Sequence, residues 1–354
     1  MTIFPPPRCC VLILLQATLC LAWGIGAFAA TDNWTNSQSG FWRVTNNWSR
    51  GTPPGSADTA FITNSTTKTV TVDASTALTN LSVSSLTLSA PLGITNTLLL
   101  ADLLTNQPMQ INSQLLLYRG GLLRITNSTM RLPSGVAQLN NYGGNISLEN
   151  GLLDFDLANL MRLGRYSTNQ ASLTVKGGTV FGSQLQIGQD KALGTLTLSN
   201  GVINLSSFLS LGTSSTGNPI AGGTGVVTVV NGQLLVTNGV TEVGYQGIGQ
   251  MNISGGTTKL AFLSVGNVQG AEGTFSISGG QLFVLPRTTN DPTRLGNAGS
   301  GRLNITGGSV ALMNELILGD YPGGPLARGT GMVMIAGGSL VATNDLTSIG
   351  KFGV

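Results

Sequence analysis

Apolar and polar residues alternate in short segments that recur between Gly144 and Ala342, and a Gly-Gly or Asn-Gly corner divides each segment in two. In all eight copies the positions three and five residues before the second corner residue are apolar. Such alternation predicts strands with one buried face, and Asn and Gly suit a corner that requires positive φ. The second corner residues are Gly151, Gly178, Gly201, Gly232, Gly256, Gly280, Gly308 and Gly338.

The copies begin again after 23 to 31 residues, a period that predicts a solenoid rather than one globular core. A third apolar piece ending in glycine recurs between the copies, for example Leu185–Gly188 and Leu209–Gly212. Three strands per turn predict an all-β parallel β-helix of about ten turns, roughly 50 Å long at the usual strand spacing. The corner dipeptide is also a strong hairpin signal, so stacked antiparallel hairpins remain the alternative fold.

Within one copy, the phase of the alternation predicts which side chains enter the core. Leu196, Leu198, Ile203 and Leu205 all point inward if the two-residue corner restores the phase. Length differences between copies fall mainly in three loops, which we expect to leave the rod and which are the places where a site would lie. These loops are residues 213–224, 286–293 and 320–330.

Composition limits the function classes. Glycine makes up 50 of 354 residues, only 9% of residues are charged, and Ser, Thr and Asn fill the outward strand positions. The net charge of +3 is scattered, without the basic stripe that nucleic-acid binding needs. Histidine, the commonest acid-base residue and nitrogen metal ligand, is absent. We therefore expect no nucleic-acid partner, no cofactor and no enzymatic activity.

The first 29 residues have the pattern of a signal peptide: Arg8 precedes an apolar stretch from Cys9 to Ala22, and small residues lead to a cleavage site after Ala29. The alternative is an uncleaved membrane anchor, because the apolar character continues far enough to span a bilayer. All three cysteines lie in this segment, so the mature protein would have none. No other run approaches membrane length, and we expect an exported protein at the cell surface or outside the cell.

Residues 30–75 differ from the repeats and contain Trp34, Trp42 and Trp48. We interpret this segment as an N-terminal cap that covers the exposed end of the solenoid core, which predicts buried tryptophans. The alternative is carbohydrate contact through exposed, coplanar rings. Residues 76–143 fit the repeat loosely as irregular turns, and residues 144–354 form the regular repeats.

The Trp-rich opening with its Pro-Pro-Gly-Ser-Ala-Asp turn, followed by Gly-x-apolar-x-apolar-x-Gly-Gly corners such as residues 301–308, resembles exported bacterial proteins of planctomycete and verrucomicrobial type. These carry the repeat shared by type V autotransporter passengers and PEP-CTERM-sorted surface proteins. The resemblance implies a right-handed parallel β-helix with an adhesive or structural role. It implies no catalytic residues.

Members of that group usually end in a membrane barrel or a short anchor, and neither pattern precedes Val354. We therefore predict that the sequence is a fragment of a longer protein. A last turn without a cap would expose its core edge, which predicts end-to-end association there.

One close pair of carboxylates, Asp154 and Asp156, has arginines nearby at Arg162 and Arg165. Carboxyl groups about 5 Å apart would suit a retaining glycosidase, and a calcium site is a further alternative. The apolar residues that alternate with them take the inward positions, however, so both aspartates are predicted to face solvent. We interpret the pair as a surface salt-bridge patch and only as a weak candidate for a metal site.

Arg162 is the middle residue of its third apolar piece, where Glu242 and Arg294 stand in other copies. We interpret this position as an ordinary solvated face. Three function classes follow from the sequence. The first is an exported structural or adhesive rod with surface proteins or extracellular polysaccharide as partners. The alternatives are a polysaccharide-binding or polysaccharide-degrading β-helix, and a passenger whose activity lies beyond Val354.

Overall fold

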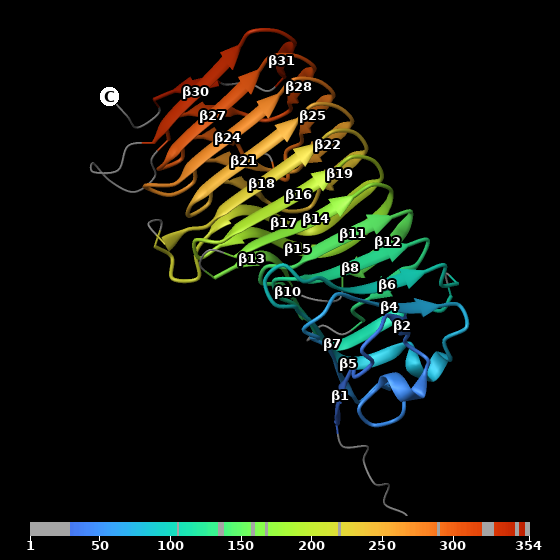
Figure 1. Cartoon of the computed structure of the whole chain (residues 1–354). Coiled ribbons are helices and arrows are strands. Elements are labelled where there is room, and N and C mark those ends of the chain that lie inside the picture. Colours follow the sequence, from blue (N-terminus) through green and yellow to red (C-terminus); the bar gives the residue numbers. More distant parts are fainter. Residues whose placement is uncertain are drawn as a thin grey trace, which may run out of the picture.

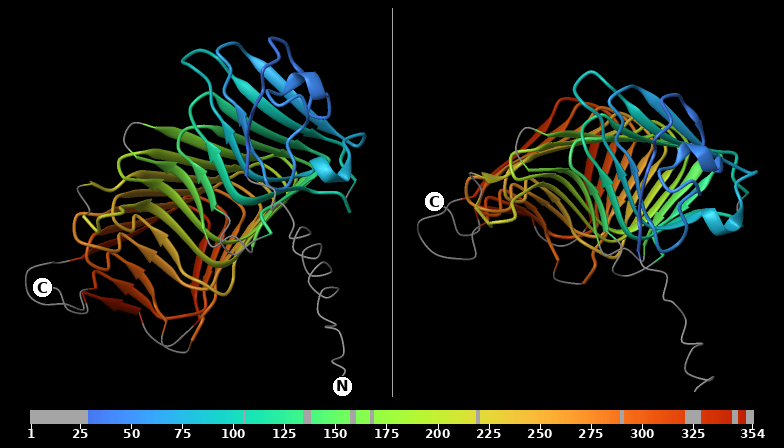
Figure 2. Two further views of the ribbon diagram at one scale, coloured as in Figure 1. Left: turned by 90° about the horizontal axis from the view of Figure 1, so that it is seen from below. Right: turned by 60° about the horizontal axis from the view of Figure 1, so that its bottom comes forward.

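A computed structural model describes residues 29–350 except 105, 134–137, 157–159, 167–168, 219–220, 289–290, 321–328 and 344–346. The described chain is a parallel β-solenoid, whose turns stack along one axis from the N-terminal to the C-terminal end (Figures 1 and 2). The predicted signal peptide, apart from Ala29, and the three cysteines lie outside the described residues.

One sheet has 12 parallel strands, one from each successive turn. Its strands supply the residues that precede each corner. They are β2 (Gly40–Phe41), β4 (Lys68–Asp73), β6 (Asn96–Ala101), β8 (Gly121–Thr126), β11 (Asn145–Glu149), β14 (Gln170–Val175), β16 (Leu193–Leu198), β18 (Thr224–Val229), β21 (Ile248–Ile253), β24 (Glu272–Ile277), β27 (Ser300–Ile305) and β30 (Thr330–Ile335).

The other sheet has 20 strands and contains two ladders, formed by the strands that follow the corner and by the predicted third pieces. The first ladder includes β9 (Thr129–Arg131), β12 (Gly151–Phe155), β19 (Gln233–Val236), β22 (Thr257–Leu260), β25 (Gln281–Val284), β28 (Ser309–Leu312) and β31 (Ser339–Ala342). The third-strand ladder includes β1 (Thr31–Asn33), β3 (Thr59–Ile62), β10 (Gln138–Asn141), β13 (Met161–Arg165), β20 (Thr241–Val243), β23 (Leu263–Val265), β26 (Thr293–Leu295), β29 (Leu316–Leu318) and β32 (Thr347–Ile349).

In some turns the second and third strands join into one long strand. These are β5 (Ser82–Leu88), β7 (Met109–Leu117), β15 (Gly178–Gln189) and β17 (Val202–Thr213). The register between β15 and β17 shifts between Gly182 and Gln184, where the chain bends from one ladder into the other. Two short 3₁₀ helices complete the described elements, η1 (Thr45–Asn47) and η2 (Leu78–Asn80).

The parallel β-helix is confirmed and the hairpin alternative is wrong. Val175 and Val180 flank one corner, yet Val175 pairs with Leu198 of the next turn and Val180 with Leu153 of the previous turn. All pairings between named strands of the described residues are parallel. The corner therefore turns the chain between strands of one coil and pairs neither strand with the other.

The predicted phase is also confirmed. Leu196, Leu198, Ile203 and Leu205 are all buried in one continuous apolar core. Their neighbours in register come from equivalent positions of adjacent turns, as in the pairing of Leu198 with Val229. Each apolar residue thus stacks on others of its kind along the axis, and burial of these ladders stabilises the rod.

The three tryptophans of the first turn are buried in this core, as the cap interpretation predicts. Trp48 packs edge-on against Trp34 at 5.2 Å and against Trp42 at 4.7 Å between ring centroids. The Trp48 indole N–H donates to the Trp42 carbonyl oxygen at 2.7 Å. Rings that are buried and meet edge-on present no flat face to a sugar, so the carbohydrate-contact alternative for Trp34, Trp42 and Trp48 loses its basis.

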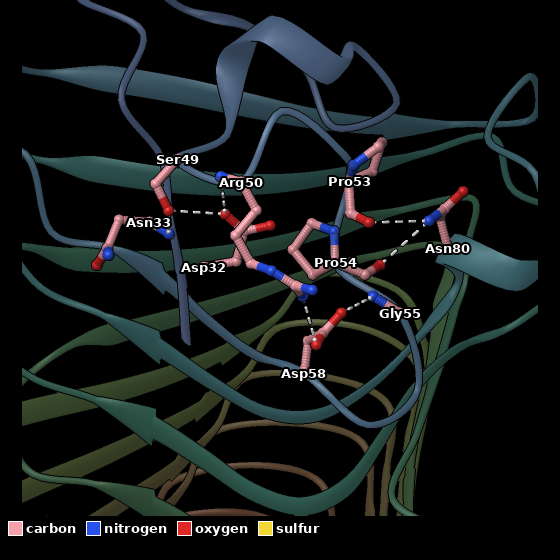
Figure 3. Close-up of polar contacts among 9 residues, drawn as sticks. All are labelled: Asp32, Asn33, Ser49, Arg50, Pro53, Pro54, Gly55, Asp58 and Asn80. Atoms are coloured by element: carbon pink, nitrogen blue, oxygen red, sulfur yellow. Dashed lines mark hydrogen bonds and ion pairs between the residues drawn. The ribbon is translucent and has the colours of Figure 1, made fainter. Parts of the chain in front are cut away.

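Polar contacts fix the loop that follows the tryptophans (Figure 3). Arg50 donates from its backbone N–H to Asp32 Oδ1 at 3.2 Å and from its guanidinium to Asp58 Oδ1 at 2.8 Å. The other oxygen of Asp58 accepts the Gly55 N–H at 2.8 Å, and the Asn80 amide donates to both carbonyl oxygens of the Pro-Pro pair. The Pro-Pro-Gly-Ser-Ala-Asp turn noted in the sequence is thus tied to the first turns.

At the other end, the last described turn exposes apolar side chains, among them Met334 and Ile335 of β30 and Val341 of β31. Val333 and Leu340 are only partly buried against the core. End-to-end association at this end stays a prediction. Among the residues that the structure describes, no helix is long and apolar enough to cross a bilayer.

Candidate ligand-binding groove

The structure places the sequence-predicted pair Asp154 and Asp156 on the outside of the rod. Leu153 and Phe155, which alternate with them, are fully buried. Asp154 Oδ2 lies 3.3 Å from Arg131 Nε, and Asp156 Oδ1 accepts a hydrogen bond from Ser206 Oγ at 3.0 Å.

The two aspartates thus face outward, as the alternation with buried residues predicts, and Asp154 forms a surface ion pair. The cation that pairs with Asp154 is Arg131 of the preceding turn, whereas the sequence pointed to Arg162 and Arg165. An exposed pair of this kind contributes a few tenths of a kcal/mol, up to about 1 kcal/mol. Within the described parts of the chain, no three acidic, histidine or cysteine side chains gather in a way that could hold a metal ion.

The middle position of the third strands forms a ladder on the outside of the rod that is polar except at Ile317. Its members stack in register through successive turns and are Asn140, Arg162, Gln186, Ser210, Glu242, Ser264, Arg294, Ile317 and Ser348. The interpretation of this position as an ordinary solvated face does not hold at the centre of the ladder, where Ser210 is 4% and Ser264 1% exposed and Glu242 between them is half-buried.

A groove of about 430 Å³ lies over the centre of this ladder. Strands β15, β17 and β20 contribute its polar floor, from three consecutive turns of the solenoid. Residues 238–240 before β20, Tyr245 in the turn after it, and Arg287 supply the walls. The lining residues are Gln186, Ser207, Phe208, Ser210, Asn238, Gly239, Val240, Glu242, Tyr245 and Arg287.

Glu242 is the only acidic residue in this lining. Its Oε2 accepts the Ser210 hydroxyl at 2.7 Å, and its Oε1 accepts the Asn267 side-chain amide at 2.9 Å. Asn267 is held in turn by Ser264 and by Asn297, which both donate to its Oδ1. Neutral donors therefore orient the carboxylate, and among the described residues no lysine or arginine forms an ion pair with it.

Burial raises the pKa of the Glu242 carboxyl, and the hydrogen bonds from Ser210 and Asn267 oppose this shift without cancelling it. Burial also raises the pKa of Tyr245, with a further contribution from the negative charge of Glu242. The phenol and the carboxyl group line the same groove.

We expect the substitution Glu242→Gln to stabilise the fold at neutral pH by about 1 kcal/mol, because it removes a desolvated charge and keeps the shape. A folded-state pKa above the unfolded value gives stability that is present below the unfolded pKa and lost as the pH rises through the folded pKa. The difference between variant and parent should therefore vanish below about pH 4, where the unfolded carboxyl is also protonated. Urea unfolding at a series of pH values measures it.

The matched control is Glu149→Gln. The side-chain hydrogen bonds from Arg124 and Lys176 lower the pKa of Glu149, so its substitution should cost stability at neutral pH, by a few tenths of a kcal/mol. A Glu242→Gln variant that is less stable than the parent at pH 7, or equally stable at all pH values, would contradict the desolvated state of this carboxyl.

A second hollow, of about 490 Å³, lies on the outward face of β19, β22 and β25. It is lined by Gln233, Thr257, Lys259, Gln281, Phe283, Leu285 and Met313. The one charged side chain of this lining, Lys259, is exposed and is not held against a buried partner group among the described residues. The groove at Glu242 is therefore the better candidate for a specific site.

The sequence contains one signal for this groove that the alternation of apolar and polar residues does not reveal. Glu242 is acidic, whereas the equivalent position in neighbouring turns holds Gln186, Ser210 and Ser264. An aromatic residue, Phe208, directly precedes the third strand piece of the turn before Glu242. No protein-family model, curated protein or solved structure matches the chain, so its candidate site stands on this geometry alone.

Proposed function

We propose that the protein is an exported structural or adhesive rod of the cell surface or extracellular matrix, of the kind that the Trp-rich opening and the repeat corners resemble. The observation that carries the proposal is the unbroken register of the 12-stranded sheet. The inward positions are occupied by core ladders and the outward ones mostly by small polar residues, so the described chain is mainly scaffold with a long lateral surface.

The groove at Glu242 supports a role in binding over a role in catalysis. Glycoside hydrolysis generally uses two carboxyl groups that flank the scissile bond, and the lining of the groove contains one. The close carboxylate pair noted in the sequence, Asp154 and Asp156, lies outside the groove in a surface ion-pair patch.

A second candidate function, polysaccharide binding, is favoured by one specific observation. Aromatic side chains and a carboxylate line a groove on one face of the rod, in Phe208, Tyr245 and Glu242. The two functions are compatible, because an adhesive rod needs a surface that recognises its partner.

Two measurements test the proposal. Residues 1–29, fused to a phosphatase that is active only outside the cytoplasm, should direct its export, with a new N-terminus at Ala30. The purified chain on beads should attach to polysaccharide-coated or cell-wall-coated surfaces and release no reducing sugar from them. A fusion that stays in the cytoplasm would overturn export, and soluble sugar products would overturn the non-catalytic role.

A further inference from the structure

We propose that the groove at Glu242 binds a segment of an uncharged glycan that lies along the axis of the rod. This inference rests on the proposed adhesive function and names the class of ligand and the residues that recognise it.

The ladder fixes the direction of the ligand. Gln186, Ser210 and Glu242 come from three consecutive turns, so their backbones repeat at the strand spacing of about 4.8 Å. This repeat is close to the length that one hexopyranose unit adds to an extended glycan chain. A glycan parallel to the axis would therefore present successive sugar units to successive polar side chains.

The floor of the groove has unmet capacity to accept hydrogen bonds. Gln186 Oε1 is buried and accepts no hydrogen bond from any described residue. Each carboxylate oxygen of Glu242 has one neutral donor, Ser210 or Asn267, and can accept a further one. A buried acceptor without a partner is costly, and sugar hydroxyl groups are donors of suitable size to satisfy both side chains.

The walls provide apolar contact beside these acceptors. Phe208 and Val240 directly precede the register partners Leu209 and Thr241, and both are half-buried. Tyr245 lines the groove from the turn after β20. Pyranose rings carry apolar C–H faces that pack on aromatic rings, while their hydroxyl groups point to the sides. The combination of a polar floor and apolar walls fits this amphipathic shape.

The charges of the groove disfavour acidic glycans. Glu242 is negative and unpaired by any described cation, so it would repel a uronate, sulfate or phosphate group in a poorly hydrated space. The one cation of the lining, Arg287, is already engaged by Asp291, with 2.9 Å between Nε and Oδ2. Uncharged hexose and pentose polymers remain as the best-matched class.

An extended peptide fits less well. Peptides that bind to sheets usually pair with an exposed strand edge, and β15, β17 and β20 are each paired on both sides by neighbouring turns. The groove offers a sheet face with side chains only. Binding of a peptide in preference to a glycan would therefore overturn the proposal.

The test uses the purified chain on an array of uncharged oligosaccharides, followed by affinity electrophoresis in gels that contain soluble β-glucan, mannan, xylan or, as the acidic comparison, polygalacturonate. We expect binding to at least one uncharged glycan and none to polygalacturonate. Phe208→Ala and Glu242→Gln should each weaken this binding about tenfold, through loss of ring stacking and of a charge-assisted hydrogen bond.

Two matched control variants remove a phenyl ring and a carboxylate outside the groove. Phe181→Ala deletes an outward phenyl ring of β15 that does not line the groove, and Glu149→Gln neutralises a carboxylate of β11 on the other sheet. Both should bind as the parent does. Thermal unfolding of each variant establishes that it is folded, and Glu242→Gln keeps the size of the side chain, so loss of binding without loss of fold is measurable.

Absence of binding to every uncharged glycan, equal binding by parent, Phe208→Ala and Glu242→Gln, or preference for polygalacturonate or a peptide would overturn the inference. Attachment of beads to surfaces tests the adhesive function independently of the groove. If beads that carry Glu242→Gln still attach to surfaces as the parent does, the rod is adhesive through another face and only the groove assignment is lost.

Discussion

The substitution Gly178→Ala is expected to destabilise its part of the rod by about 3 kcal/mol or more, whereas Gly51→Ala should cost about 1 kcal/mol. Both glycines have positive φ, at +81° and +69°, so both variants carry the backbone penalty of a side chain in this region. Only Gly178 stacks on the corner of the preceding turn, where a Cβ atom would lie 2.1 Å from the Gly151 carbonyl oxygen. A Cβ atom at Gly51 would meet nothing within 4 Å.

The difference between the two variants therefore isolates the steric cost of stacking corners at the strand spacing. Urea unfolding gives the free energies, and amide hydrogen exchange locates the damage. Because each turn contacts only its neighbours, protection should fall first in β12 and β15 and less in distant turns. Equal destabilisation by both variants would show that backbone conformation, and not contact between corners, makes glycine necessary at Gly178.

Local periodicity explains why so much of this fold can be predicted from sequence. The alternation before and after each corner assigns Leu196 and Ile203 to the same core although they lie on different strands, and the structure buries both. The third strand follows from the recurring piece that ends in Gly188 and Gly212, two further residues with positive φ. In a solenoid each turn repeats the contacts of the last, so a pattern read in one copy applies to the others.

The groove could not be predicted in the same way. The phase assigns Ser210 and Glu242 to the outer face correctly, but how far an outward side chain is exposed depends on what lies above that face. Here Tyr245 and Arg287 line the groove above this face, and the strands bend at the register shift near Gly182. These features differ from turn to turn, so they cannot be predicted from the repeat pattern.

The buried carboxyl group of Glu242 is better explained by a role in binding than by a role in stability. A residue that served only the fold would be expected to stabilise it, yet burial of this charge costs free energy at neutral pH, since no described residue forms an ion pair with it. Gln would satisfy Ser210 and leave the ladder intact. A side chain that weakens the scaffold where a groove opens is the pattern expected of a binding site.

At the N-terminal end, we expect Trp48→Ala to remove about 3 to 5 kcal/mol of local stability, because it leaves a cavity among fully packed rings. The Trp48 ring contacts Trp34 and Trp42 and is 2% exposed. Trp48→Phe is the matched control. It keeps much of the aromatic volume and loses the N–H donated to the Trp42 carbonyl oxygen, which should cost only about 1 kcal/mol.

The location of the loss tests the cap interpretation more sharply than its size. Each turn of a solenoid contacts only its neighbours, so the damage in Trp48→Ala should be confined to β1 to β4 while the central turns keep their exchange protection. The same substitution should leave glycan binding in the groove unchanged, since β15, β17 and β20 lie several turns away. If Trp48→Ala instead abolished glycan binding while β1 to β4 stayed protected, the tryptophans would be a recognition surface and the cap interpretation would be wrong.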